Sequence, residues 1–562
     1  MQPGRWGKNA VLIAAGSGCL LLWLALPPCG WFPLGWFAPL PWLWLVRQPV
    51  LPGRRPYLAL WAASSAFWLV YLQGVRLAHP ALYLGWLALS LYLAVYLPVF
   101  IALTRAAVGR LGCPLALAAP ITWIGLETIR SRLVSGFTGG MLAHTQTPWT
   151  LAIQVADLGG AYLLSGLMMA IAACLLESVL AWRARRLDEH AGGGRRAATY
   201  LVAATTLLAG TLGYGAWRLA HSPLPHADPA DRLRIALIQE SIDTIFEYHP
   251  ERNVEAFRRY LDRTAAACAE HGPLDVVVWP ESMFTENTPE FLADPGVTSD
   301  ELLARQVAFQ RKVQVAASRL RPRPPADASP APPTPPHAPV LIAGTITLHI
   351  TPPTGREYNT ALLIRPDGQV TDRYYKRHLV MFGEYIPAGN WFPWLYQLAG
   401  MPGGLTAGEE PRAFQVDGWR MAPSICFESL VPHLLRDHAV ALERRGTPAD
   451  VQVNLTNDGW FWGSSLLDMH LQGGVFRAVE LRRPFVIAAN TGLSAWIDSD
   501  GRLRQVAPRR QGATLLATVE RDQRTPLYQR IGDLPWAGCA ILTLLLVGPL
   551  FWPVRRPDLA GT

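Results

Sequence analysis

Three short segments of the chain place a reactive side chain directly after an apolar run that is typical of a buried strand. Glu281 follows VVVWP, Lys376 lies in RYYKRHLVMFGEYIP, and Cys426 ends APSIC. A carboxylate, an amine and a thiol are the groups that nucleophilic acyl transfer needs: the thiolate attacks, the carboxylate moves the proton, and the cation stabilises the oxyanion. Each residue type alone is more often structural, so their occurrence together at strand ends is what indicates chemistry.

Two further carboxylates and two histidines lie close to these segments in the sequence. Glu384 stands in FGEY, and Glu428 follows the cysteine by two residues. His378 and His470 are alternative acid–base groups, but we interpret them as structural because the carboxylate, the amine and the thiol already supply the needed roles. No phosphate-binding glycine loop and no metal-ligand cluster stands out, so we expect neither a metal nor another cofactor.

The stretch that carries these residues alternates short β-rich runs with helical periodicity, which is typical of a layered α/β domain. The turn signals Asp367-Gly368 and Asp500-Gly501 predict two hairpins. Strands are expected at 233–239, 274–279, 339–348, 359–364, 421–426, 451–455, 484–489 and 513–519. Helices are expected at 252–271, 299–320, 431–444 and 467–481. Residues 321–339 are rich in proline and alanine and predict an exposed loop, with peptide docking as the open alternative.

Composition indicates a membrane protein. Of 562 residues, 50% are hydrophobic and 16% are charged, and the apolar residues concentrate in the first part of the chain and near its end. The net charge of +8 comes with arginines clustered between apolar runs, so nucleic-acid binding is disfavoured. Seven cysteines without CxxC pairs indicate neither a zinc site nor a disulfide framework.

Eight membrane-spanning helices are predicted, because a bilayer core of about 30 Å needs roughly 20 apolar helical residues. Six runs are clear and two are interrupted by prolines. A cleaved signal peptide is the alternative for the first run, but Pro27 and Pro28 argue against it. The clear runs are 10–26, 57–75, 82–104, 158–182, 197–217 and 536–554, and the interrupted ones are 31–46 and 113–129.

The arginines of the short loops predict the orientation. They cluster in every second loop, which should therefore be cytoplasmic, together with both termini. We thus expect a membrane domain over 1–222, a catalytic domain over 223–533 on the outer, periplasmic side of a bacterial inner membrane, and a last span with a cytoplasmic tail over 534–562.

The order Glu281, Lys376, Cys426 within WPES, YYK and ICFES resembles the nitrilase, or carbon–nitrogen hydrolase, superfamily. The segments HLVMFGEYIP and NLTNDGWF, with seven spans before the domain and one after it, resemble the apolipoprotein N-acyltransferase family over essentially the whole chain. The resemblance implies a four-layer αββα sandwich. It also implies that Glu281 is the general base and acid, Lys376 the oxyanion stabiliser and Cys426 the nucleophile.

The same resemblance implies supporting roles and substrates. Glu384 and Glu428 would support the network, and Trp460 and Phe461 would shape the acyl or lipoprotein pocket. The acyl donor would be the sn-1 chain of a phospholipid, phosphatidylethanolamine foremost, and the acceptor a diacylated apolipoprotein; we expect a monomer. Trp391 and Trp394 lie in an aromatic segment that is expected either as a lid at the membrane interface or as a packed surface loop.

Two other functions remain open from the sequence. A membrane-tethered amidase would use the same three residues with water as acceptor, but it has no need of eight spans or a lipid-facing aromatic segment. A transporter or structural membrane protein is disfavoured because Glu127 and Glu177, the ionisable residues noted in the spans, lie near predicted span ends.

Overall fold

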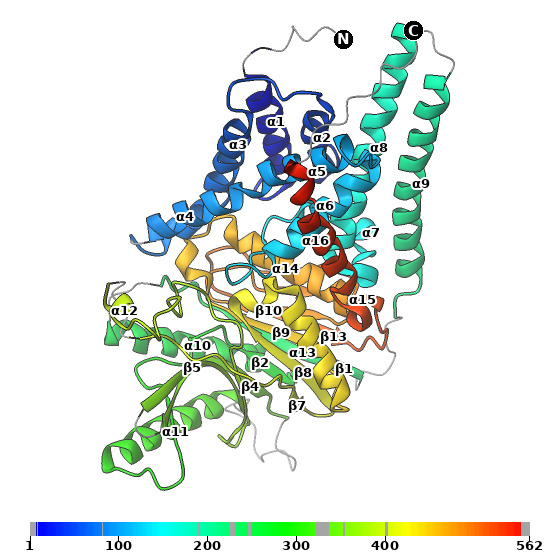
Figure 1. The fold of residues 1–562 in the computed structure, drawn as a ribbon. Coiled ribbons are helices and arrows are strands. Elements are labelled where there is room, and N and C mark those ends of the chain that lie inside the picture. The colour runs from blue at the N-terminus through cyan, green and yellow to red at the C-terminus, as the bar shows by residue number, and fades with distance from the viewer. Residues whose placement is uncertain are drawn as a thin grey trace. The chain divides into compact units, whose positions relative to one another are not determined.

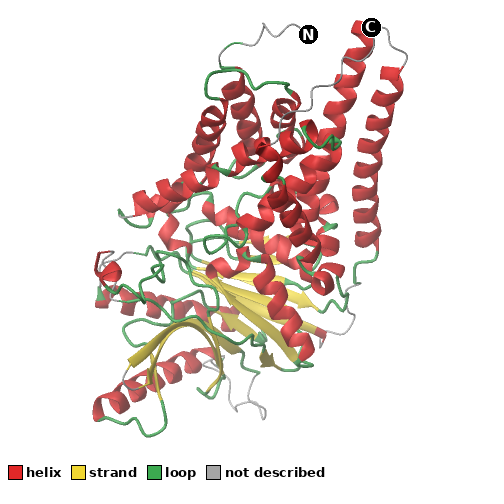
Figure 2. Ribbon diagram, in the orientation of Figure 1, coloured by secondary structure: helices red, strands yellow, loops and turns green. Residues whose placement is uncertain are grey.

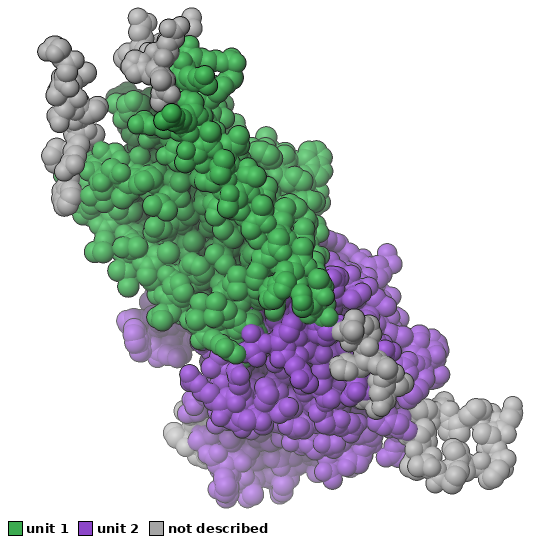
Figure 3. Space-filling view, turned by 90° about the vertical axis from the view of Figure 1, so that its right-hand side faces the viewer, with its two compact units in different colours: residues 1–73, 83–222, 526–562 green, residues 74–82, 223–525 purple. Residues whose placement is uncertain are grey.

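The computed structural model describes Gly7 and residues 9–80, 82–188, 192–223, 231–244, 249–321, 337–351, 354–398 and 403–551. The chain divides into two compact units, coloured separately in Figure 3. We call residues 1–73, 83–222 and 526–562 the helical unit, and residues 74–82 and 223–525 the sheet unit. Most of the predicted Pro-rich loop, residues 322–336, lies outside the described residues.

The helical unit consists of helices joined by short connections (Figure 1). Helix α8 contains a break at Gly159 and Gly160, where the backbone leaves helical geometry. The helices are α1 (Ala10–Ala25), α2 (Pro39–Arg47), α3 (Pro56–Tyr71), α4 (Leu82–Ala94), α5 (Tyr96–Gly109), α6 (Leu115–Arg130), α7 (Thr150–Ile153), α8 (Ala156–Asp188), α9 (Gly192–Ala220), α15 (Leu527–Ile531) and α16 (Leu534–Leu545). Short 3₁₀ turns are η1 (Phe32–Trp36), η2 (Gln73–Leu77), which crosses into the sheet unit, η3 (Leu142–Gln146) and η7 (Gly548–Phe551).

Four helical segments of the described chain are long and apolar enough to cross a membrane. They are 82–109, which joins α4 and α5, 156–186, 193–220 and 534–551. Helix α1 is apolar but has only 16 residues. The predicted spans 31–46, 57–75 and 113–129 form α2, α3 and α6, which are shorter than their predicted spans. The four long segments fit a membrane protein, and the count of eight spans stays a prediction.

The sheet unit contains two sheets. The first has seven strands in the order β13-β1-β2-β4-β5-β6, with β3 paired to β4, and the second has six in the order β12-β11-β10-β9-β8-β7. The strands of the first sheet are β1 (Arg232–Gln239), β2 (Val276–Val278), β3 (Glu290–Ala293), β4 (Val340–Thr351), β5 (Thr354–Ile364), β6 (Val370–Tyr375) and β13 (Ala513–Glu520). Those of the second are β7 (Phe414–Val416), β8 (Trp419–Ile425), β9 (Val451–Thr456), β10 (Phe485–Ala489), β11 (Ala495–Ile497) and β12 (Leu503–Val506).

The two sheets pack face to face, with helices on their outer faces (Figures 1 and 2). The alternation along β1 shows why: Leu233, Ile235 and Leu237 enter the core between the sheets, whereas Ala236 and Ile238 face the helices. This is the αββα sandwich that the sequence predicts. The helices are α10 (Pro250–Glu270) and α11 (Asp300–Leu320) on the first sheet, α13 (Pro432–Arg444) and α14 (Leu466–Leu481) on the second, and the short α12 (Trp394–Leu398).

The helix α11 illustrates how the sequence sets an element. Ser299 caps its start by accepting a hydrogen bond from the Leu302 amide at 3.1 Å, and Asp300 and Glu301 follow in the first turn, where the helix dipole favours negative charge. Its apolar side chains then recur at helical spacing and enter the core against the first sheet. The predicted start at Ser299 is therefore correct to within one residue.

All eight predicted strands and four predicted helices of this unit are present, with ends shifted by a few residues. The predicted hairpins are also confirmed, since β5 pairs antiparallel with β6 across Asp367-Gly368 and β11 with β12 across Asp500-Gly501. The sequence analysis missed β3, β6, β7, β11 and β12, each of six residues or fewer.

Candidate active site

Each of the three reactive side chains lies just past a strand end. Glu281 follows β2 by three residues, Lys376 directly follows β6, and Cys426 directly follows β8. The first two strands belong to one sheet and β8 to the other, so the groups are contributed by both sheets of the sandwich. Strand ends hold side chains more rigidly than free loops do.

The ammonium of Lys376 is fully enclosed and paired with two carboxylates. Its Nζ lies 2.9 Å from Oε1 of Glu384 and 3.3 Å from Oε1 of Glu281, and 1% of the side chain is exposed. Burial alone would lower the pKa of Lys376, but Glu384, Glu281 and the nearby Cys426 raise it well above its usual value. The lysine therefore keeps its positive charge between the two carboxylates.

Both carboxylate oxygens of Glu281 accept hydrogen bonds. Oε1 accepts from Asn359 Nδ2 at 2.7 Å as well as from Lys376, and Oε2 accepts from the Asn457 amide at 2.9 Å. Strand β4 runs directly against this turn, and a Cβ on Gly344 would lie 2.6 Å from the Glu281 Cα. Only glycine permits this close approach.

Asn359 is a site residue that the sequence analysis missed. Its side-chain Nδ2 donates to both carboxylates, at 2.7 Å from Glu281 Oε1 and 2.9 Å from Glu384 Oε1. The backbone carbonyl of Asn359 accepts a hydrogen bond from the Lys376 backbone amide at 2.8 Å. Glu384 is further fixed by the Val380 amide, which donates to Oε2 at 2.8 Å. A polar residue inside the otherwise apolar strand NTALLI was the available sequence signal.

Cys426 occupies a left-handed backbone conformation, with φ of 53°, at the first residue of the turn η5 (Cys426–Leu430). Its carbonyl accepts hydrogen bonds from Ser429 Oγ at 3.2 Å and Asn454 Nδ2 at 3.3 Å, which hold this conformation. The side chain is half-buried. Burial and the charge of Glu281 raise the pKa of the Cys426 thiol well above its usual value, against the opposing charge of Lys376. The resting group is consequently a thiol.

Glu428 joins the segment after β6 to the turn that carries the cysteine. Its carboxylate accepts from the amides of Ile425 at 2.7 Å, Arg377 at 2.7 Å and His378 at 3.1 Å, and from Tyr374 Oη at 3.0 and 2.9 Å. Burial raises the pKa of Glu428, while the amide donors and Lys376 oppose that rise. Glu428 thus fixes the backbone on either side of the site.

A buried aspartate–histidine pair lies under the segment NLTNDGWF. His470 Nδ1 is 2.9 Å from Oδ1 of Asp458, which also accepts from Thr456 Oγ1 at 3.0 Å. Burial opposes the charged imidazole, but Asp458 raises the pKa of His470 above its usual value. Asp458 also contributes to the raised pKa of Cys426, so the pair belongs to the electrostatic surroundings of the thiol.

The aromatic residues singled out in the sequence fall into two groups. Trp460 and Phe461 end the short turn η6 (Asp458–Phe461) and are half-buried, with the Phe461 ring 6.4 Å from that of His470. Trp391 and Trp394 are 82% and 57% exposed.

A carboxylate, a buried ammonium and a partly buried thiol on the ends of strands from two packed sheets define a cysteine-dependent acyl-transfer or amide-cleaving enzyme of the carbon–nitrogen hydrolase class. The Carbon-nitrogen hydrolase family model matches residues 335–529, and the model described as the Apolipoprotein N-acyltransferase N-terminal domain matches residues 17–174. These two matches fall on the two parts of the chain that the sequence analysis separates.

The chain belongs to the apolipoprotein N-acyltransferase family. The curated Apolipoprotein N-acyltransferase of Rhodopirellula baltica is 33% identical over 98% of this chain and 99% of its own length. That of Geobacter metallireducens is 31% identical over 96% and 95%. The crystal structure of Saccharomyces cerevisiae Nit3, of the nitrilase superfamily, is 15% identical over 54% of this chain and 95% of that chain, with a TM-score of 0.36. The two curated relatives confirm the family predicted from the sequence.

Proposed function

We propose that this protein transfers a fatty acyl group from a membrane phospholipid to the N-terminal amine of a diacylated apolipoprotein, through a thioester on Cys426. The observation that carries the proposal is the buried Lys376 ammonium between Glu281 and Glu384, electrostatically coupled to the thiol. Family membership supplies the substrates, because the curated relatives are named apolipoprotein N-acyltransferases.

In the first step the Cys426 sulfur attacks the ester carbonyl of the phospholipid as Glu281 takes the thiol proton. Lys376 stabilises the negative charge that develops on the carbonyl oxygen. The intermediate collapses by breaking the bond to the glycerol oxygen, which takes the proton back from Glu281 and leaves as a lysophospholipid. The acyl group then remains on sulfur as a thioester.

In the second step the free α-amine of the diacylglyceryl-cysteine attacks the thioester carbonyl, and Glu281 takes one amine proton. Lys376 again stabilises the oxyanion. Collapse breaks the carbon–sulfur bond, forms the amide and returns the proton from Glu281 to Cys426. The enzyme is thereby restored, and no redox partner or cofactor is required by the balance of atoms.

The acyl donor in this proposal is phosphatidylethanolamine, cleaved at sn-1, and a monomer is sufficient for the reaction. Both substrates carry acyl chains in the bilayer, and each buried methylene contributes about 0.8 kcal/mol, so extraction into water would oppose the reaction strongly. A catalytic domain anchored by helices avoids that cost, and the four long apolar segments support such anchoring.

The topology in this proposal has eight spans, with both termini in the cytoplasm and residues 223–533 in the periplasm of a bacterial inner membrane. The arginine-rich loops support it through the preference of cytoplasmic loops for positive charge. Trp391 and Trp394, both exposed, are proposed to contact the membrane interface as part of a lid, and Trp460 and Phe461 to line the acyl or lipoprotein pocket.

The deciding experiment incubates the purified protein with a phospholipid labelled in its sn-1 acyl chain, first alone and then with a diacylated lipopeptide. Mass spectrometry should find the label on the peptide that contains Cys426 and afterwards on the lipopeptide amine. Cys426→Ala should carry no label, whereas Cys268→Ala, which changes the other cysteine of the sheet unit, should behave as the unaltered protein. Normal transfer by Cys426→Ala would exclude the proposal.

The rival activity is amide hydrolysis by the same three residues, with water in place of the amine. It is not favoured, because the relatives that match over nearly the whole chain are acyltransferases by name. The same assay separates the two activities: a hydrolase would release labelled fatty acid at the same rate with and without the lipopeptide.

A further inference from the structure

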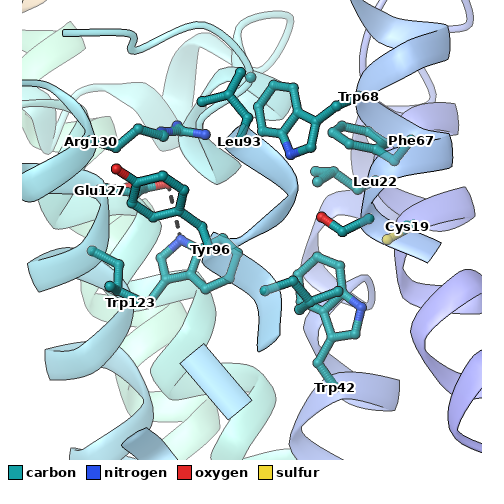
Figure 4. A pocket seen from close by; sticks show the side chains of 14 residues that line it. Cys19, Leu22, Trp42, Phe67, Trp68, Leu93, Tyr96, Trp123, Glu127 and Arg130 are labelled. Carbon is teal, nitrogen blue, oxygen red and sulfur yellow. Dashed lines mark hydrogen bonds between the residues drawn. The ribbon is translucent and has the colours of Figure 1, made fainter. Parts of the chain in front are cut away.

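The helical unit contains a cavity that is separate from the buried Glu–Lys–Cys site. Helices α1 to α6 all contribute side chains to it, and aromatic rings form much of its wall (Figure 4). Its volume of about 50 Å³ gives room for about four water molecules. The aromatic residues of the wall are Trp42, Phe67, Trp68, Tyr96 and Trp123.

An arginine with two unsatisfied guanidinium nitrogens lines this cavity. Arg130, at the end of α6, is 6% exposed, and its Nε and Nη2 atoms make no hydrogen bond within the part of the chain that the structure describes. These two atoms form one edge of the guanidinium and donate in parallel, which matches two oxygens of a phosphate. The guanidinium also lies against the ring of Trp68, whose centroid is 5.4 Å away.

A carboxylate lies one helical turn earlier on the same wall. Glu127 is 5% exposed, and its Oε1 accepts from Trp123 Nε1 at 3.0 Å and from the Leu142 amide at 3.1 Å. Oε2 is buried and has no hydrogen-bond donor within 3.5 Å among the described residues, although the Ser165 hydroxyl also acts on this carboxylate. No ion pair within 4.0 Å joins Glu127 to Arg130 among the described residues, although the two opposite charges act on each other at longer range. The cavity is therefore lined by a positive and a negative group that are not in direct contact.

Unpaired charged groups in an apolar interior are costly and indicate a functional site, because burial removes the water that would solvate them. A single anion would satisfy Arg130 but would be repelled by Glu127, and a single cation would meet the opposite difficulty. A zwitterion with its charges a few atoms apart satisfies both. The aromatic rings of the wall favour a cationic group as well, since their faces attract ammonium ions.

We propose that this cavity binds the zwitterionic head group of an aminophospholipid, with the phosphate on Arg130 and the primary ammonium against Glu127 and the neighbouring rings. The volume admits parts of a head group rather than an acyl chain, so the chains of the lipid remain in the surrounding bilayer. The proposal rests on the proposed placement of the helical unit in a membrane. It assigns a lipid site outside the catalytic centre.

The test is native mass spectrometry of the full chain, delipidated in detergent and titrated with lipids that share the same two acyl chains. The lipids are phosphatidylethanolamine, phosphatidylcholine, phosphatidylglycerol and diacylglycerol. The variants are Arg130→Met and the matched control Arg132→Met. Arg132 lies two residues further along, is 52% exposed and pairs with Asp533 at 2.7 Å, so its loss removes the same charge outside the cavity.

Arg130→Met is expected to lower the retention of phosphatidylethanolamine at least tenfold, while Arg132→Met leaves it unchanged. The retention that depends on Arg130 is the difference between the unaltered protein and Arg130→Met. This difference should be at least fivefold larger for phosphatidylethanolamine than for phosphatidylcholine, whose quaternary ammonium cannot donate to Glu127. It should also be at least fivefold larger than for phosphatidylglycerol, which has no cation. Equal retention by the two variants, or equal retention of all four lipids, overturns the proposal.

Two further measurements complete the test. Should Arg130→Met not fold, the head-group series on the unaltered protein decides, and Glu127→Gln should reduce the preference for phosphatidylethanolamine over phosphatidylglycerol. Soluble O-phosphoethanolamine, if it competed at the concentration of the lipid, would assign the site to a free metabolite and overturn the lipid assignment. Acylation of Cys426 is read in the same spectra as a mass shift, so failed acyl transfer is distinguishable from an empty cavity.

Discussion

At the scale of single residues, the charge of Glu281 acts on both Cys426 and Lys376. The raised pKa values of the thiol and the ammonium mean that the resting site holds SH and NH₃⁺. In the proposed mechanism, a thiolate therefore forms as its proton passes to Glu281 during attack, rather than in advance. This distinguishes the site from cysteine enzymes whose thiol has a lowered pKa and is already ionised.

Glu281→Gln should consequently abolish the transfer of that proton while the side chain keeps its size. We expect the rate of Cys426 acylation to fall by about 100-fold to about 10,000-fold, as for removal of a general base. The measurement is single-turnover labelling by a labelled phospholipid. Glu409→Gln is the control, since Glu409 is exposed, and it should retain the full rate. A loss below about tenfold for Glu281→Gln would assign the proton transfer to another group.

Lys312 fixes the turn that follows Glu281. Its Nζ donates to the carbonyls of Phe284 and Thr285, each at 2.8 Å, and to the carbonyl of Thr288. Three carbonyls need three N–H donors, which only the protonated amine has. Burial lowers the pKa of Lys312 to about 7, with Glu286 acting in the opposite direction.

In the folded protein, Lys312 thus loses its proton as pH rises through about 7, and one of the three carbonyls then loses its donor. We expect the single-turnover rate of the unaltered protein to decrease by about threefold between about pH 6 and about pH 8, and the rate of Lys312→Met not to show this decrease. Arg311→Met, which changes the exposed neighbouring cation, should keep the decrease. Identical pH profiles for all three proteins would show that Lys312 has no positioning role.

At the scale of elements, Glu428 couples the end of β6 to the end of β8 through the Arg377, His378 and Ile425 amides. In the unaltered protein these donors share the two carboxylate oxygens of Glu428, and Glu428→Gln leaves them a single carbonyl oxygen. Leaving a buried donor unsatisfied costs about 1–3 kcal/mol. We expect a lower midpoint of thermal unfolding and a fall in the acylation rate with little change in KM. A change in KM alone, measured over a range of phospholipid concentrations, would contradict this positioning role.

The elements themselves were largely predictable from the sequence where burial imposes a pattern. The apolar runs in β1, β4 and β10 and the alternation of apolar and polar residues in β9 identify strands, and the start of α11 is marked by Ser299. The edge strand β12 was missed because all four of its residues are exposed, so no apolar pattern distinguishes it from a loop. Strand β6 was missed because VTDRYY alternates too weakly between apolar and polar residues.

The composition of the site was predictable and its geometry was not. Glu281 and Cys426 stand at the ends of predicted strands and Lys376 stands in the motif YYK, so their types and order are visible in the sequence. Asn359 joins the carboxylates only because β5 pairs with β6 in a register that sets Thr360 opposite Tyr375. Register across a sheet depends on tertiary packing, which no local pattern specifies.

At the scale of the whole molecule, exposed aromatic side chains follow Glu384 within the sheet unit. Trp391, Phe392 and Trp394 are 82%, 51% and 57% exposed, and Phe382 is 54% exposed. Large exposed apolar side chains in one segment are characteristic of a surface that contacts a membrane or a partner. Tryptophan in particular favours the membrane interface, where its ring is buried and its N–H remains hydrated.

The double variant Trp391→Asp with Trp394→Asp tests this membrane contact. If the segment inserts at the interface, two charges there should weaken the use of long-chain phospholipid in vesicles by at least about 100-fold, because each buried apolar side chain is worth about 1.5–3 kcal/mol and about 1.4 kcal/mol is a factor of ten. A short-chain phospholipid below its micellar concentration needs no interface, so its use should stay unchanged. Leu503→Asp, on exposed β12 of the same unit, is the control and should affect neither substrate. An equal loss with both substrates would place the tryptophans in substrate binding or folding, since only an interfacial role makes the effect depend on the bilayer.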